Sequence, residues 1–418
     1  MNYSKLYLKP KKEDSLLRFH PWVFSGAIKA DVPVQEFASR NALVEGDIVE
    51  VYSTDGCFLG VGHYQPGSIT VRILSFEPEE INIAFWEKRI RDAYRLRCTL
   101  GLVDRHGLAP RNDANAELAN RNNIYRLIHG EGDMLSGLII DIYGQTAVIQ
   151  AHSAGMHYAR KDISEALKNV YGSQLQRIYY KSEGTLPFKA DLREENEYLC
   201  GADSKEAHVA TENGLTFHID WLKGQKTGFF IDQRDNRMLL RQYAKNRSVL
   251  NMFCYTGGFS VYALQGGASM VHSVDSSAKA ISLTDENINL NFPDDLRHKS
   301  FAEDAFKYMT TIDNQYDIII LDPPAFAKRQ NALHNALQGY RKLNALAFNK
   351  IRSGGILFTF SCSQAVSRQD FRLAVFTAAV QSGRTVRILH QMTQPADHPI
   401  NICHPEGEYL KGLVLAVD

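Results

Sequence analysis

The C-terminal part of the chain repeats one pattern, a short apolar run followed in most cases by a polar segment long enough for a helix. Seven such runs occupy residues 248–253, 270–275, 298–304, 316–322, 355–361, 385–390 and 413–417. Apolar runs that alternate with helices are typical of a mostly parallel sheet covered on both faces. We therefore expect an α/β domain with a mostly parallel, seven-stranded sheet over residues 191–418.

The N-terminal half has a different rhythm. Glycine-bearing turns separate β-like runs at residues 47–53, 58–64 and 69–74, which predicts a small antiparallel barrel or sandwich over residues 1–77. Residues 78–190 combine an expected helix at 82–100, strands with glycine turns, a helix near 156–170 and a strand at 177–182. This middle block is α+β, so we expect three domains in all.

Composition narrows the class of protein. The chain has 418 residues, of which 44% are hydrophobic and 22% charged, as in soluble globular proteins. It has no apolar run near the ~20 residues that span a bilayer and no signal-like N-terminus, so we expect a cytoplasmic protein without a membrane partner. The six cysteines form no CxxC pairs and have no close histidine partners, which argues against a metal site or disulfides.

The charge distribution bears on a nucleic-acid partner. The 47 basic and 47 acidic side chains cancel, which counts mildly against one. Residues 1–30, however, hold six Lys or Arg against two acids, and we take Lys9, Lys11, Lys12 and Arg18 as candidate RNA-binding residues. A second basic cluster within residues 88–97 is equally well read as a solvated helix face.

Chemistry-bearing residues follow the predicted strands of the C-terminal block. Ligands bind outside the carboxyl ends of the strands in such sheets, so these positions are where a site is expected. They are Tyr255, Thr256 and Gly257; Asp275 and Ser276; Asp304 and Ala305; Asp322 and Pro323; and Ser361, Cys362 and Ser363. Each group alone could be ordinary turn chemistry. Five groups at successive strand ends favour a binding site instead. The glycine turn lacks full GxGxxG spacing, which disfavours a dinucleotide.

Three segments, LNMFCYTGGFSVYA, LDPPAFAK and SCS, together carry a specific resemblance. The chain resembles the RlmI-type family of 23S rRNA cytosine methyltransferases from LYLKPKKEDSLLRFHPWVFSGAI through KTGFFIDQRDNR to HPEGEYLKGLVL. The resemblance implies a PUA domain and a middle domain before a Rossmann-like class I methyltransferase domain. It also implies that S-adenosylmethionine is the cofactor and 23S rRNA the partner.

The resemblance also assigns roles to residues. Asp275 and Asp304 would bind the nucleoside of the cofactor, and the motif Asp322-Pro323-Pro324 would bind the target base. The segment 226–237 would lie against the cofactor, with contacts from Phe230, Gln233 and Arg234. Its alternative reading is a helix N-terminus capped by Asp232.

The chemistry of cytosine methylation explains a cysteine after the fifth strand. Carbon-5 is a weak nucleophile, and addition of a thiolate to carbon-6 makes it electron-rich. Cys362 is the candidate nucleophile, and Asp322 would hydrogen-bond nitrogen-3 or the exocyclic amine. The alternative is that Cys362 is a small buried hydrophobe, as we expect of Cys254. Many such enzymes carry a second cysteine where this chain has Ala325, so the group that removes the carbon-5 proton stays open.

Other functions stay open at this point. A methyltransferase acting on guanine nitrogen-7 or adenine nitrogen-6 would use a similar Asp-Pro-Pro motif but would leave Cys362 without a task. An inactive RNA-binding assembly factor would keep the fold and lose cofactor binding. A small-molecule methyltransferase would leave the N-terminal 190 residues unexplained. The patterns leave a homodimer open as well.

Overall fold

The computed structural model describes residues 3–29, 43–103, 122–186, 192, 196–203, 208–327 and 329–418. The chain divides into two compact units, which are described separately. The first unit comprises Met1–Gly214, Ile219–Phe229 and Ala396–Gly407, and the second comprises Leu215–His218, Phe230–Pro395 and Glu408–Asp418.

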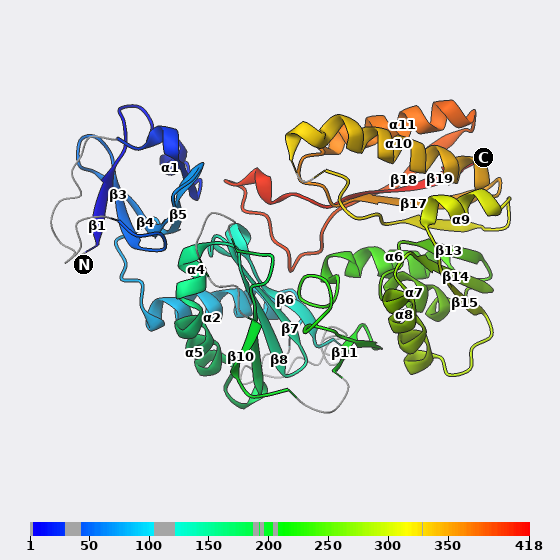
Figure 1. Ribbon diagram of the computed structural model, residues 1–418, viewed down its shortest axis with the longest axis horizontal. Helices are drawn as coiled ribbons and strands as arrows, with labels where there is room; N and C mark the ends of the chain where they lie inside the picture. Colours follow the sequence, from blue (N-terminus) through cyan, green and yellow to red (C-terminus); the bar gives the residue numbers. More distant parts are fainter. Residues whose placement is uncertain are drawn as a thin grey trace. The chain divides into compact units, whose positions relative to one another are not determined.

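A five-stranded sheet with the order β1-β3-β4-β5-β2 forms the start of the first unit (Figure 1). Its elements are β1 (Ser4–Tyr7), α1 (Asp14–Leu17), β2 (Trp22–Phe24), η1 (Ser25–Ala27), β3 (Ile48–Tyr52), β4 (Phe58–Tyr64) and β5 (Ile69–Ser75). β1 and β3 are parallel, whereas the other neighbours are antiparallel. The expected small β-rich module is therefore present, with one parallel pair because α1 and β2 intervene between β1 and β3.

A second five-stranded sheet, ordered β10-β9-β8-β7-β6, follows in the same unit. Its elements are α2 (Ile83–Thr99), β6 (Ile124–His129), η2 (Gly130–Asp133), β7 (Leu138–Tyr143), β8 (Thr146–Ala151), α4 (Ala154–Tyr158), α5 (Arg160–Tyr171), η3 (Gly172–Gln174), β9 (Arg177–Lys181) and β10 (Asn196–Cys200). The side chain of Asn82 caps α2 by accepting from the Phe85 N–H. Phe85, Trp86 and Ile90 of α2 are buried in the core that covers this sheet.

The sheet of the second unit has seven strands in the order β15-β14-β13-β16-β17-β19-β18. They are β13 (Ser248–Met252), β14 (Met270–Asp275), β15 (His298–Ala302), β16 (Ile318–Leu321), β17 (Gly355–Ser361), β18 (Val386–Met392) and β19 (Lys411–Val417). β19 is antiparallel to both of its neighbours, and the other pairs are parallel. The expected mostly parallel sheet is confirmed, and each strand lies at its predicted run. Two shorter strands, β11 (Val209–Glu212) and β12 (Leu215–His218), form a separate pair.

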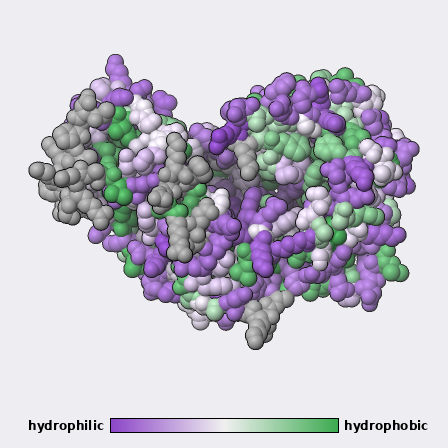
Figure 2. Space-filling model, in the orientation of Figure 1, coloured by the Kyte–Doolittle hydropathy of each residue, from purple (hydrophilic) through white to green (hydrophobic). Residues whose placement is uncertain are grey.

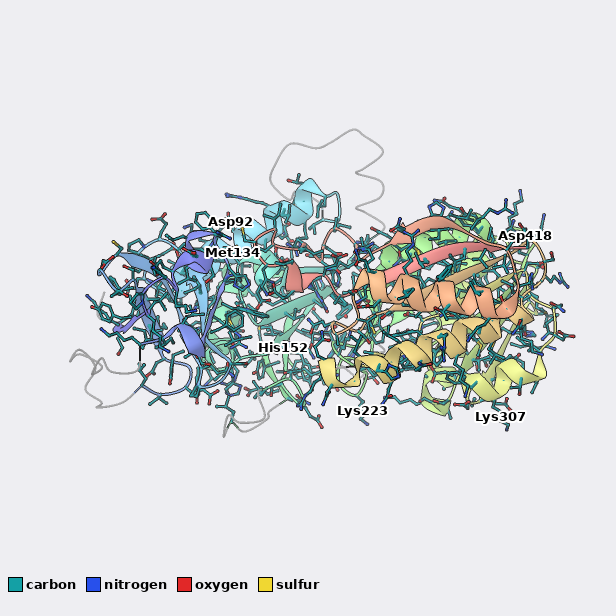
Figure 3. All side chains as sticks on the ribbon, turned by 90° about the horizontal axis from the view of Figure 1, so that it is seen from above. Asp92, Met134, His152, Lys223, Lys307 and Asp418 are labelled. Carbon is teal, nitrogen blue, oxygen red and sulfur yellow. The ribbon has the colours of Figure 1, made fainter. Side chains whose placement is uncertain are left out.

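Helices cover both faces of the seven-stranded sheet. They are η4 (Ile231–Gln233), α6 (Arg234–Tyr243), α7 (Gly258–Gln265), α8 (Ala278–Asn291), α9 (Ala305–Thr311), η5 (Gln330–Ala332), α10 (Leu333–Lys350) and α11 (Arg368–Ser382); the turn η6 (Pro405–Gly407) belongs to the first unit. Figures 1 and 3 show α10 and α11 side by side on one face, where Tyr340 and Phe371 join the buried core with Leu321 and Leu357 of the sheet. Because both faces are covered, the carboxyl ends of the strands are left for ligands.

One face of the molecule is largely polar. Figure 2 shows hydrophilic side chains over much of the face in view. Within the part of the chain that the structure describes, no helix combines the length and the apolar character needed to cross a membrane.

Candidate active site

The loop between β13 and α7 has an unusual backbone. Phe253, Tyr255 and Gly257 have φ values of 58°, 49° and 74°, in the left-handed region that bulky residues rarely adopt. A Cβ at Gly257 would lie 2.6 Å from Thr284 Cγ2, so this position requires glycine for space as well as conformation. Thr284 Oγ1 on α8 donates to the Tyr255 carbonyl at 2.9 Å. Strain of this kind, held by neighbouring side chains, is typical of ligand-binding turns.

Asp275 at the end of β14 is fixed against this loop. Its Oδ2 accepts from the Tyr255 N–H at 3.0 Å, and its Oδ1 accepts from the Ser277 N–H at 2.9 Å. Each carboxylate oxygen has a further lone pair, so the half-buried group can also accept two hydroxyl hydrogens. This pattern fits the ribose of a nucleoside. Ser276 lies beside it and is exposed.

Asp304 stands one strand further along the sheet, at the start of α9. Its Oδ1 accepts from the Lys307 N–H at 2.9 Å and so caps the helix. The capping role uses one oxygen of an exposed carboxylate and leaves the other available. Ala305 is buried behind it.

The segment before α6 reaches the same loop. The Phe230 ring meets the Tyr255 ring edge-on, with centroids 5.1 Å apart, and the Phe230 carbonyl accepts from Arg237 Nη1 at 2.9 Å. Gln233 and Arg234 are both buried. The alternative reading of Asp232 as a helix cap is wrong, because its carboxylate accepts from the Tyr409 hydroxyl at 2.7 Å and α6 begins without a side-chain cap.

The ends of β16 and β17 bring the two candidate catalytic motifs together. The Cys362 Sγ lies 3.9 Å from the Pro323 carbonyl oxygen. Cys362 and Asp322 are half-buried, whereas Pro323 is buried. The parallel pairing of β16 with β17 places these loops side by side. A thiol at this position is held by the sheet and still partly accessible.

Tyr340 of α10 braces both serines that flank Cys362. Ser361 Oγ donates to the Tyr340 hydroxyl at 2.9 Å, and the same hydroxyl lies 3.2 Å from Ser363 Oγ. Burial raises the pKa of Tyr340, so it stays a neutral hydrogen-bonding group. The sequence patterns did not identify Tyr340, because a tyrosine on an amphipathic helix has no local sign of such a role.

Lys411 is a second residue that the patterns missed. It is buried at the start of β19, where it pairs with Ser361 in the strand register. Its Nζ donates to the Ser363 carbonyl at 2.6 Å, and burial lowers the pKa of Lys411 to about 8. The available signal was a lysine directly before the apolar run GLVLAV.

Cys254, the other cysteine at a strand end, is in a different environment. It is buried, its Sγ lies 3.6 Å from Thr284 Oγ1, and burial raises its pKa to about 12. Such a thiol is inert, in keeping with the packing role expected of it.

Comparison with known proteins identifies the family. A model of S-adenosylmethionine-dependent methyltransferases matches residues 186–403, and a model of PUA-like domains matches residues 6–76. The ribosomal RNA large subunit methyltransferase I of Aeromonas hydrophila is 38% identical over 418 residues, which covers 99% of each chain. The protein of the same name in Escherichia coli O139:H28 is 37% identical with the same coverage. The chain belongs to this methyltransferase family.

Solved structures agree on the fold of the methyltransferase. A candidate SAM-dependent methyltransferase from Streptococcus mutans covers 99% of this chain with a TM-score of 0.79 at 23% identity. A candidate methyltransferase complexed with SAH gives a TM-score of 0.80, also at 23% identity. The expected fold, a PUA-like domain followed by a class I methyltransferase, is confirmed, and S-adenosylmethionine is the cofactor.

The basic residues near the N-terminus of the methyltransferase lie on one exposed stretch of the first unit. Lys9, Lys11 and Lys12 follow β1, and Arg18 ends α1. Lys9 Nζ donates to the Gly26 carbonyl at 3.1 Å. Phe19, next to Arg18, is 57% exposed, and its ring meets the Phe76 ring edge-on with centroids 5.3 Å apart.

The second basic cluster is not a uniform surface in this unit. Arg97 is fully buried, and its Nη2 donates a hydrogen bond to Asp133 Oδ2 at 2.8 Å. Arg89 Nη2 donates to the Leu74 carbonyl at 2.8 Å. Arg97 is therefore interior and Arg89 is half-buried, so these two arginines do not belong to an exposed face.

Proposed function

We propose that the enzyme transfers a methyl group to carbon-5 of a cytosine in large-subunit rRNA through a covalent bond to Cys362. The observation that carries the proposal is the approach of the Cys362 thiol to the Pro323 carbonyl, at 3.9 Å. This contact places a partly accessible thiol next to the Asp-Pro-Pro motif. A methyltransferase acting on a ring nitrogen would have no use for that thiol.

The thiol solves the chemical problem of the reaction. S-adenosylmethionine supplies an electrophilic methyl group on a sulfonium. Cys362, as the thiolate, bonds to carbon-6 of the ring, so the electron pair of the carbon-5–carbon-6 double bond becomes available at carbon-5 for the methyl group. Carbon-5 then loses its proton, and the carbon–sulfur bond breaks to restore the ring and the thiolate.

Asp322 would hold the target base. Addition of sulfur places negative charge on nitrogen-3 and the exocyclic groups. The carboxyl group of Asp322, at the end of β16, can donate a hydrogen bond there when it is protonated. Asp322 and Pro323 also border the cofactor. We assign the remaining cofactor contacts to Phe230, Gln233, Arg234, Tyr255, Thr256, Gly257, Asp275, Ser276, Asp304 and Ala305.

The rRNA substrate is proposed from the names of the relatives and from the PUA-like domain. Lys9, Lys11, Lys12 and Arg18 would neutralise phosphates, and the target cytosine would leave its stack at a cost of a few kcal/mol. Alanine at all three lysines should weaken RNA binding and flatten its dependence on salt, as measured by titration at several salt concentrations. Unchanged binding would remove this stretch from the RNA interface.

The test of the reaction uses RNA that contains 5-fluorocytidine. Fluorine cannot leave carbon-5 as a proton does, so the protein should stay attached to the RNA and migrate as an adduct on a denaturing gel. Cys362→Ala should form no adduct, whereas Cys254→Ala should form it like the wild type. Methylation of a nitrogen, with no adduct from the wild-type protein, would overturn the proposal.

A further inference from the structure

Lys411 is a buried cation that the proposed reaction has not yet used. Lys411 is only 3% exposed. Buried lysines are rare, because removal of an ammonium group from water is costly. The antiparallel register of β17 and β19 sets Lys411 opposite Ser361, and its Nζ donates to the Ser363 carbonyl at 2.6 Å. The lysine thus holds the residues on both sides of Cys362.

Two charged side chains besides Cys362 influence Lys411, and they come from neighbouring segments. Glu408 precedes β19, Arg368 begins α11, and these two form an ion pair with each other on the surface. Their effects on Lys411 oppose one another. On α10, Tyr340 contributes a neutral hydroxyl to the same serines. An ionised Cys362 raises the pKa of Lys411, and it does so more than Glu408 does.

We infer that Lys411 takes the proton of the Cys362 thiol and then, as an ammonium ion, stabilises the thiolate for attack on the base. This inference rests on the proposed function in one respect, because that function identifies the ring that the thiolate attacks. The ionisation of the Cys362 thiol does not depend on it. The S–H bond breaks, its electron pair stays on sulfur, and the proton forms a new N–H bond on the amine. Lys411 acts on the substrate only through Cys362.

The pKa of about 8 fits this exchange. A normal lysine would almost never be a free amine at neutral pH, whereas one with this pKa is uncharged in roughly a tenth of molecules at pH 7. Below about pH 8 the ammonium form predominates, so its attraction for a thiolate is present there and is lost as the pH rises through that value.

The test measures the thiol without RNA. The full-length protein is treated with iodoacetamide across pH 5.5–9.5, and alkylation of the Cys362 peptide is followed by mass spectrometry. Lys411→Met, which keeps the length of the side chain and removes its charge, should move the midpoint of the alkylation profile upward by about one pH unit or more. Lys411→Arg should stay closer to the wild type, because it restores a cation.

Two controls keep the result interpretable. Arg368→Gln combined with Glu408→Gln removes the neighbouring surface charges and should leave the profile nearly unchanged. Thermal melting checks that Lys411→Met folds. A folded Lys411→Met protein with the wild-type profile would overturn the inference. A shifted profile with no 5-fluorocytidine adduct would uphold the lysine's role and overturn the proposed reaction instead.

Discussion

Two cysteines stand at the carboxyl ends of strands in one sheet, and their surroundings give them different chemistry. Cys254 follows β13, is buried against Thr284, and has its pKa raised to about 12 by burial. Cys362 follows β17, is half-buried, and lies beside a buried lysine. The comparison shows that a position at a strand end gives a thiol access to a ligand. The burial and charge that the neighbouring segments provide determine whether that thiol can react.

The same contrast extends to the loops themselves. The β13 loop is held through the backbone of Tyr255, by the side chains of Thr284 on α8 and of Asp275, which suits it to bind a cofactor. The β17 loop is held by the side chains of Tyr340 and Lys411, which suits it to position one sulfur atom. Four experiments can break or sharpen this comparison.

The largest effect should come from exchanging the two cysteines for alanine. Cys362→Ala should lower kcat for RNA methylation by about a thousandfold or more, because the activated ring can no longer form. Cys254→Ala should keep kcat within about threefold and instead lower stability by about 1 kcal/mol, through loss of buried volume. Methyl incorporation and thermal melting measure the two. Near-normal activity of Cys362→Ala would contradict the assignment of the reactive thiol to the β17 loop.

Asp275→Ala should weaken cofactor binding by roughly 10- to 100-fold, because hydrogen bonds to a charged group contribute about 1.5–3 kcal/mol each. Titration calorimetry with S-adenosylmethionine measures the affinity directly. Asp313→Ala is the matched control, because Asp313 is an exposed carboxylate that lies between α9 and β16, at the opposite end of the sheet. Equal affinity in both variants would remove Asp275 from the site.

Gly257→Ala should destabilise the fold and lower cofactor affinity. The new methyl group meets Thr284, and alanine must adopt a left-handed backbone at this position. The contact with Thr284 should lower the free energy of unfolding by about 1–3 kcal/mol beyond the effect of the backbone strain alone. Gly383→Ala is the control for strain, because Gly383 has φ of 68° and nothing lies within 4 Å of its added Cβ. Chemical denaturation compares the two. Similar losses would show that space at Gly257 does not matter.

Tyr340→Phe should have the smallest effect. It removes the hydroxyl that links Ser361 and Ser363, at about 1 kcal/mol in stability. If the tyrosine positions Cys362, kcat should fall several-fold while the affinity for S-adenosylmethionine stays the same. Loss of cofactor affinity in this variant would mean that the two loops do not act separately.

Much of the site could be predicted because strand periodicity and parallel connectivity are local signals. Each apolar run became a strand of the sheet, and the residues after the parallel strands came to one edge. Asp275 and Cys362, which stay predicted site residues, were placed at this edge in this way. The reading of Asp232 as a helix cap failed, because its partner Tyr409 is distant in sequence. The basic cluster on α2 misled for the same reason, since burial of Arg97 depends on Asp133.

The sequence by itself determined the order of strands and helices, the family, and which side chains stand at the strand ends. Only the tertiary structure decided that Lys411 lies beside Cys362 and that Cys254 is closed off. Alternation of apolar and polar residues is encoded over a few neighbouring positions. Burial, and the shift of a pKa that burial causes, depend on segments that meet only after the chain has folded.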